Sequence, residues 1–122
     1  MESKKEMKNR YKEMKFRMGV FQIRNTKNQK IFIGSSTDVD AIWNRIRTEL
    51  KFGSYPNPEL LKDWNLYGDD SFVFEILNEI KPTEDDKHIN YRKEVKELES
   101  MFIDELQPFN ERGYNAPEKF SK

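Results

Sequence analysis

Two short runs of β-branched and aromatic residues, separated by a polar turn, constrain the fold of this chain most strongly. Residues 19–25 read GVFQIRN and residues 30–34 read KIFIG, around the polar residues 26–29. This arrangement is typical of a β-hairpin. Because side chains alternate between the faces of a strand, every second residue of each run, Phe21 and Phe32 among them, is expected to share one face of its strand.

The residues after this hairpin predict an amphipathic helix. Apolar residues recur at the spacing of one helical face, and they are Val39, Ile42, Trp43, Ile46 and Leu50. Residues 35–37 (Ser-Ser-Thr) supply an N-terminal cap, and Gly53, which has no Cβ, suits a left-handed C-terminal cap. The other side of the helix carries Arg45, Arg47 and Lys51. These three cations are expected to form a basic ridge that faces solvent or phosphate.

Two more helices and a third strand follow. Residues 57–59 (Asn-Pro-Glu) are a strong helix start, and Gly68 ends that helix. Residues 71–80 alternate as a strand does, and residues 89–106 predict a last helix that Pro108 ends. The chain is therefore expected to be an α+β domain, in which helices pack against a small antiparallel sheet formed by residues 19–25, 30–35 and 71–80.

Composition excludes several classes of protein and site. The chain has no cysteine, which rules out disulfides, thiolate metal sites and cysteine nucleophiles and favours a reducing, cytoplasmic setting. It has no run of about 18 apolar residues, so no membrane partner is expected. Phosphate-loop, zinc-finger and Ser/His/Asp patterns are absent from the sequence. The single histidine, His88, lies beside Asp85 and Asp86 in a predicted loop, and we do not expect it to bind a metal.

Charge is unevenly distributed along a chain whose net charge is zero. Residues 1–51 hold 13 Lys and Arg against 6 Asp and Glu, whereas residues 52–122 hold 9 against 16. A basic half of this kind suits a polyanion, although opposite charges paired within one fold produce the same count. Residues 1–17 predict an amphipathic helical extension, which precedes a domain at 18–116 and a tail at 117–122. The extension is either a basic arm that touches phosphates or a helix that docks on the core, a partner protein or a second copy through Met7, Tyr11 and Met14.

Several motifs, taken together and in this order, resemble the GIY-YIG endonuclease superfamily over residues 19–115. Residues 19–21 (Gly-Val-Phe) stand where that family has its first signature triplet, and residues 32–34 (Phe-Ile-Gly) where it has the second. Further similar segments are Ser35-Ser36, Trp43-Asn44, residues 61–68, residues 72–77, residues 98–104, Pro108-Phe109-Asn110 and Gly113-Tyr114-Asn115. The resemblance implies a GIY-YIG nuclease-like fold with an extra N-terminal helix.

The resemblance also implies a set of active-site positions. The family cuts DNA phosphodiesters with one divalent metal, Mg²⁺ or Mn²⁺, held by a glutamate. Two tyrosines serve proton transfer and water orientation, and an arginine, often accompanied by a histidine, steadies the phosphate. Carried over to this chain, the glutamate falls on Glu99 and an active-site asparagine on Asn110. The tyrosine, arginine and histidine positions hold apolar residues, namely Phe21, Phe32, Ile42 and Ile46.

These replacements remove the groups that would transfer a proton and neutralise charge on the phosphate. Phenylalanine has no hydroxyl to relay a proton, and a positioned acid or base is worth about 10²- to 10⁴-fold in rate. Isoleucine cannot neutralise charge on a phosphate, a loss of roughly 10²- to 10³-fold. The cleft is expected to be filled by its own apolar side chains. Glu99 is expected at its rim, reaching water or a tyrosine in preference to a metal, and Arg45 or Arg47 is a candidate replacement cation.

Three functions remain open from the sequence. The first is a nucleic-acid-binding module without cleavage, which would use the basic residues Lys15, Arg17, Arg24, Lys27, Lys30, Arg45, Arg47 and Lys51. The second is a protein-interaction or regulatory domain, which would use the apolar cleft or the N-terminal helix. The third is a DNA endonuclease with a rearranged site, which would need Mg²⁺ or Mn²⁺; the other two need no cofactor.

Overall fold

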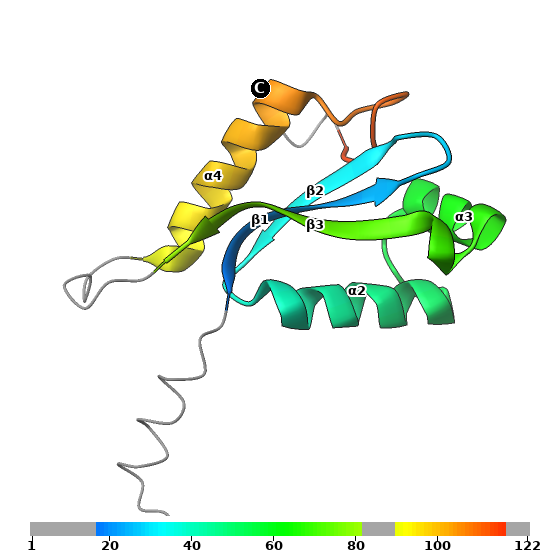
Figure 1. The fold of residues 1–122 in the computed structure, drawn as a ribbon, viewed down its shortest axis with the longest axis horizontal. Helices are drawn as coiled ribbons and strands as arrows, with labels where there is room; N and C mark the ends of the chain where they lie inside the picture. Colours follow the sequence, from blue (N-terminus) through cyan, green and yellow to red (C-terminus); the bar gives the residue numbers. More distant parts are fainter. Residues whose placement is uncertain (1–16, 82–89, 117–122) are drawn as a thin grey trace, which may run out of the picture.

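A computed structural model describes residues 17–81 and 90–116 of the chain. A three-stranded antiparallel sheet with the order β2-β1-β3 forms the centre, and helices cover both of its faces (Figure 1). The strands are β1 (Met18–Asn25), β2 (Ile31–Ser36) and β3 (Phe72–Ile80). The helices are α2 (Val39–Phe52), α3 (Pro58–Tyr67), the short 3-10 helix η1 (Asp69–Ser71) and α4 (Tyr91–Leu106). The predicted α+β fold with a three-stranded antiparallel sheet is confirmed.

Strand β1 lies at the centre of the sheet and pairs with both neighbours. Its hairpin with β2 is confirmed, and Phe21 pairs with Gly34 across it. The pairing of β1 with β3 shifts register between Val20 and Phe21. Gly19 lies so close to β3 that a Cβ there would be 1.9 Å from the backbone oxygen of Asn78. The centre of the sheet therefore depends on a residue without a side chain at position 19.

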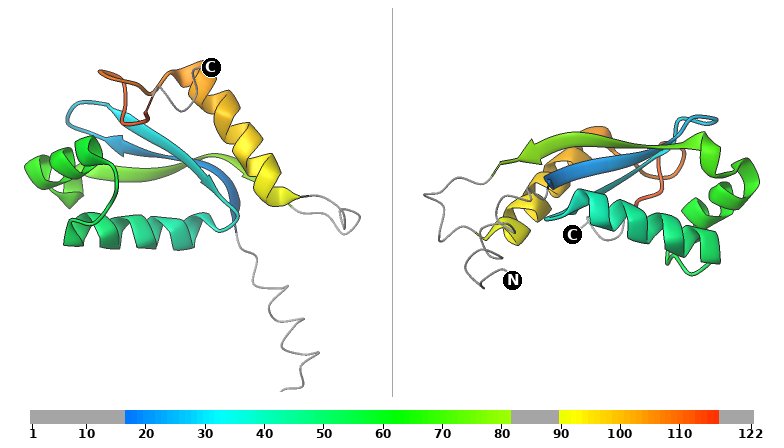
Figure 2. Two further views of the ribbon diagram at one scale, coloured as in Figure 1. Left: turned by 180° about the vertical axis from the view of Figure 1, so that it is seen from behind. Right: turned by 60° about the horizontal axis from the view of Figure 1, so that its bottom comes forward.

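Helices α2 and α3 cover one face of the sheet, and α4 covers the other. On the first face, Phe21 and Ile23 belong to the same buried core as Ile46 of α2. On the second face, Val20 packs with Ile103 of α4. Figure 2 shows the sheet lying between α4 and the α2–α3 pair. The alternation read from the sequence thus divides the apolar residues between two cores.

The ends of α2 differ in part from the prediction. The N-cap is Asp38, whose side chain accepts a hydrogen bond from the backbone N–H of Ala41 at 3.1 Å, and not a residue of the 35–37 segment. The carboxylate of Asp38 reaches this N–H, whereas the hydroxyl of Ser36 is used to hold the backbone of Asp38 itself. Gly53 ends the helix in the predicted left-handed conformation.

The segment after α4 returns to the free edge of β2. Gly113 forms a parallel bridge with Ile31, at a position where a Cβ would lie 2.3 Å from the Ile31 backbone oxygen. The side-chain amide of Asn115 then donates to the carbonyl of Ile33 and accepts from its N–H, both at 2.9 Å. The tail is therefore held against β2 at Ile33, next to Gly34.

Some sequence predictions lie outside the described residues. These are the N-terminal helix with Met7, Tyr11 and Met14, the basic residue Lys15, and the loop that contains His88. Within residues 17–81 and 90–116, no helix is long and apolar enough to cross a membrane.

Candidate functional site

The active-site positions that the family resemblance implies converge on one cavity of about 1110 Å³. It opens beside the edge strand β2, and its walls come from α2, the loop after α2, α4 and the C-terminal tail. Its lining includes every position carried over from the family resemblance, namely Phe21, Phe32, Ile42, Ile46, Glu99 and Asn110. Residues that are up to 89 positions apart in the sequence are thus brought to a single cleft.

The floor of this cleft is apolar. Phe21 and Ile46 are 2% and 3% exposed, and Phe32 and Ile42 are half-buried. The ring of Phe21 reaches the cleft beneath Gly34, where a Cβ would lie only 2.6 Å from its Cζ atom. A side chain at position 34 would therefore push this ring out of place.

The expectation that apolar side chains fill the cleft is wrong. Helix α2 is fixed on the sheet by the buried residues Val39 and Leu50, and α4 is fixed on the opposite face by Ile103. Because each helix is held by its own core, neither can move to occupy the space between them. The compact isoleucines of α2 therefore line a hollow instead of closing it.

Glu99 is one of three glutamates that line the cleft, together with Glu49 and Glu59, and it is held by two neighbours. Its side chain is only 12% exposed. Its Oε1 accepts a hydrogen bond from the Ser35 hydroxyl at 3.1 Å, and its Oε2 lies 3.7 Å from the ammonium of Lys96. Burial raises the pKa of Glu99 above its ordinary value, although Lys96 and Ser35 oppose that rise. The carboxylate is therefore tied to a serine and a lysine, whereas the sequence predicted that it would reach water or a tyrosine.

This raised pKa predicts a pH-dependent stability. In the folded state the ionised carboxylate is disfavoured, so its destabilising contribution is present at neutral pH and disappears as the pH falls through the folded pKa. Glu99→Gln is therefore expected to raise the thermal unfolding midpoint slightly at neutral pH and to leave it unchanged near pH 4, roughly where a free glutamate is protonated. Glu97→Gln, on the exposed side of α4, controls for the lost charge. An equal shift at both pH values would contradict this reading.

Glu99 offers a hard cation such as Mg²⁺ one protein ligand, a single carboxylate. No group of three or more acidic or histidine side chains suited to a metal occurs in the described part of the chain. A single carboxylate is still compatible with Mg²⁺, which keeps several waters and takes phosphate oxygens from its substrate. The ammonium of Lys96 already neutralises part of the charge on Glu99. Of the three glutamates that line the cleft, Glu99 stands where the resemblance places the metal-holding glutamate, so Glu99 is the residue that would hold such an ion.

Two further polar groups lie on the cleft wall: Arg45, one of the two replacement cations that the sequence suggested, and Tyr55, which sequence reasoning missed. Arg45 lies on the wall, where its Nε donates to Glu49 at 3.1 Å, and Tyr55 lies on the loop after α2. Burial, followed by the charge of Glu49, raises the pKa of Tyr55 to about 12. At neutral pH its hydroxyl is therefore a proton donor and not a base. Tyr55 lies in an irregular loop, where no periodicity in the sequence could assign it to the cleft.

The C-terminal tail supplies the predicted Asn110 and two further cleft residues, Tyr114 and Asn115, to which the sequence assigned no role in the site. Asn110, in a left-handed turn, and Asn115 both line the cleft, but the amide of Asn115 is engaged with β2. Tyr114 donates to Asp63 at 2.7 Å, and burial raises its pKa to about 12. The sequence signal for Tyr114 and Asn115 was the family-like triplet at 113–115.

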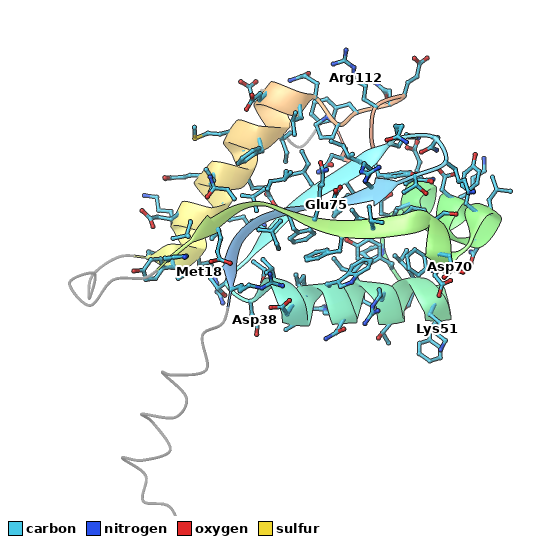
Figure 3. All side chains as sticks on the ribbon, in the orientation of Figure 1. Met18, Asp38, Lys51, Asp70, Glu75 and Arg112 are labelled. Carbon is cyan, nitrogen blue, oxygen red and sulfur yellow. The ribbon has the colours of Figure 1, made fainter. Side chains whose placement is uncertain are left out.

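Most of the predicted DNA-binding cations that the structure describes already have acidic partners. Arg17 pairs with Asp40, Arg24 pairs with Glu75 at 2.9 Å, and Lys30 lies 3.9 Å from Glu59. Figure 3 shows Glu75 near the middle of β3. Residues 17–81 and 90–116 together hold 13 Lys and Arg and 15 Asp and Glu. The excess of positive charge counted over residues 1–51 is thus largely paired within the fold or carried by residues 1–16.

The expected basic ridge on α2 is divided between two sides of the helix. Arg45 faces the cleft, whereas Arg47 lines a second hollow of about 590 Å³ and lies 5.4 Å from the ring centre of Trp43. Lys51 is exposed near the end of α2 (Figure 3), and Lys27 is exposed in the hairpin turn. Of the three cations Arg45, Arg47 and Lys51, only Arg45 lines the cleft, so they form no continuous basic ridge beside it.

Comparison with known proteins gives a consistent result. No protein-family model matches the chain. Intron-associated endonuclease 1 of Enterobacteria phage T4 is 36% identical over 99 residues, which are 80% of this chain but 36% of the length of that protein. A mutant of the catalytic domain of intron endonuclease I-TevI superposes with a TM-score of 0.67 at 29% identity, covering 82% of this chain and 93% of that domain. A second structure of the catalytic domain of homing endonuclease I-TevI gives a TM-score of 0.64 at 32% identity, covering 80% and 96%.

Proposed function

Because this chain belongs to the GIY-YIG endonuclease superfamily, we propose that it is a nucleic-acid-binding module with a degenerate active site and little or no endonuclease activity. One observation carries this proposal. Phe21, Phe32, Ile42 and Ile46 stand together on the walls of one cleft, at positions where the resemblance places hydroxyls and cations.

The chemistry of phosphodiester cleavage explains why these four residues matter. Attack by water on a phosphodiester requires proton transfer and stabilisation of charge on the phosphate oxygens. The phenyl rings of Phe21 and Phe32 can accept or donate no proton, and Ile42 can stabilise no charge. A buried apolar wall instead makes a charged phosphate costly to place there, because the phosphate loses its hydration without gaining partners.

The family relationship and the position of Arg45 support nucleic acid as the partner. The related proteins are endonucleases by name, and we propose that this chain retains DNA as a ligand. The side chain of Arg45 uses its Nε to bond Glu49, and a guanidinium has two further amino groups that can meet a phosphate at the cleft opening. A phosphate held in this way releases counterions from the nucleic acid.

Salt dependence tests this proposal. We expect the affinity for DNA to fall steeply as salt concentration rises, and Arg45→Gln to make the slope of log K against log salt shallower by about one. Arg47→Gln is a matched control, because it removes the same charge from the same helix on the side away from the cleft. The measurement is fluorescence anisotropy of labelled DNA across a salt series. Absent or salt-insensitive binding would reject nucleic acid as the partner.

A second candidate function, a DNA endonuclease with a rearranged site, has one specific observation in its favour. Arg45 and Tyr55 share the cleft with Glu99, so a cation and a hydroxyl from new positions join the carboxylate that the resemblance places there. In a rearranged endonuclease, Glu99 would hold Mg²⁺ or Mn²⁺, which supplies positive charge at the phosphate when bound. Tyr55, protonated at neutral pH, would donate a hydrogen bond, and Arg45 would orient the phosphate. Endonuclease activity is part of the name of the phage T4 relative and is stated for that protein alone.

A further inference from the structure

The cleft combines an aromatic floor with a single accessible arginine at its edge. Phe32 and Tyr55 are both half-buried, and their rings meet edge to face with centroids 6.3 Å apart. Ile42 packs on the same core beside them. The Arg45 side chain is 72% exposed, which leaves it free to reach a ligand outside the hollow. Glu49, Glu59 and Glu99 also line the cleft, and Glu49 and Glu99 are paired with Arg45 and Lys96. An occupant therefore needs a flat, apolar part inside the cleft and an anionic part that stays outside it, at the exposed guanidinium of Arg45.

The backbone of a DNA duplex does not match these walls. A duplex presents charged phosphates on its outside and keeps its bases stacked inside, so an apolar floor would meet the part of the duplex that is hardest to desolvate. A base in a single strand is different, because it can unstack and place its π face against aromatic side chains. The flanking phosphate then stays at the edge, in water and within reach of an arginine.

The size of the cleft agrees with such an occupant. Ligand pockets typically enclose about 300–1000 Å³, and this cavity measures about 1110 Å³. Its walls do not need to open to admit a nucleotide. The walls are also fixed, since Asn57 ties the loop that holds Tyr55 to the tail through a 2.8 Å hydrogen bond to the carbonyl of Tyr114.

From these features we propose that the cleft binds an unstacked base of a single-stranded nucleic acid. Phe32 and Tyr55 contact the base, and Arg45 contacts an adjacent phosphate. This inference rests on the proposed nucleic-acid-binding function and narrows it to one class of strand.

Two pairs of matched variants test this inference. Phe32→Leu and Tyr55→Leu keep an apolar side chain but remove the π face. Phe52→Leu and Tyr67→Leu make the same changes at exposed positions outside the cleft, where Phe52 is 76% exposed at the end of α2. Anisotropy is measured with a labelled oligothymidylate of about 12 nucleotides, the matching oligouridylate, and a duplex of equal length. Thermal melting verifies that each variant is folded.

We expect the single strands to bind more tightly than the duplex at equal salt. Phe32→Leu and Tyr55→Leu should each weaken single-strand binding by about tenfold, the loss of roughly one stacking contact, while the two control variants remain unchanged. Comparing oligothymidylate with oligouridylate identifies whether DNA or RNA supplies the base. Equal loss in cleft and control variants, or a preference for duplex, overturns this inference and leaves the proposed function standing. Binding of neither strand nor duplex overturns both.

Discussion

The quadruple variant Phe21→Tyr, Phe32→Tyr, Ile42→Arg, Ile46→His is expected to nick plasmid DNA in the presence of Mg²⁺ at least about 100-fold faster than the native chain. All four positions line the cleft, so the added hydroxyl, guanidinium and imidazole groups reach the same space as Glu99. Because the effects of groups in a shared site are not additive, the gain is expected from the set and not from any single change.

Because two of the four substituted residues are buried, this variant needs controls for folding. Phe21 and Ile46 are almost fully buried on their inner sides, so the new polar groups must point into the hollow or lose their hydration. Thermal unfolding and circular dichroism verify that the variant retains the fold. Adding Glu99→Ala to the four changes should abolish the gained nicking. A folded quadruple variant that remains inactive would show that these four residues do not account for the missing chemistry.

Gly19→Ala is expected to destabilise the domain by about 3 kcal/mol or more, since it combines a steric clash with an unfavourable backbone conformation. A Cβ at this position would lie 1.9 Å from the carbonyl oxygen of Asn78, and both atoms belong to paired strands. Neither strand can yield without breaking the β1–β3 ladder. At a total stability of roughly 5–15 kcal/mol for a domain, a loss of this size lowers the unfolding midpoint markedly.

Gly53→Ala separates the two causes. Gly53 has a φ of +78°, yet nothing lies within 4 Å of the position a Cβ would take. Its replacement should therefore cost only the left-handed conformation, about 1–2 kcal/mol. Chemical denaturation of both variants beside the native chain provides the comparison. Equal losses for Gly19→Ala and Gly53→Ala would contradict the close approach of β1 and β3.

The sheet and its helices could be predicted because local patterns agreed with the global fold. The alternation through Phe72 and Phe74 identified β3, and the apolar spacing from Val39 to Leu50 identified α2. Gly53 and the cap at Asn57 marked helix ends because their chemistry is local. The N-cap of α2 was misplaced, since three hydroxyl residues and an aspartate compete there within a few positions.

The site could be predicted only where it follows motifs. Phe32 and Glu99 were found from spacing relative to a family pattern, whereas Tyr55 and Lys96 carry no such signal. The different roles of Arg45 and Arg47 depend on how α2 rotates on the sheet. The hollow itself depends on the separation of two helices anchored in different cores. Such properties arise from tertiary packing, which residue patterns alone do not determine.

The most direct test of the proposal that the cleft binds nucleic acid without cleaving it is a plasmid-nicking assay. The native chain and a Glu99→Ala variant are compared in Mg²⁺ and in Mn²⁺. We expect both proteins to leave supercoiled plasmid intact at the rate of the buffer alone. Metal-dependent nicking by the native chain that disappears in Glu99→Ala would contradict this account, and would make Arg45 and Tyr55 the working groups of a rearranged active site.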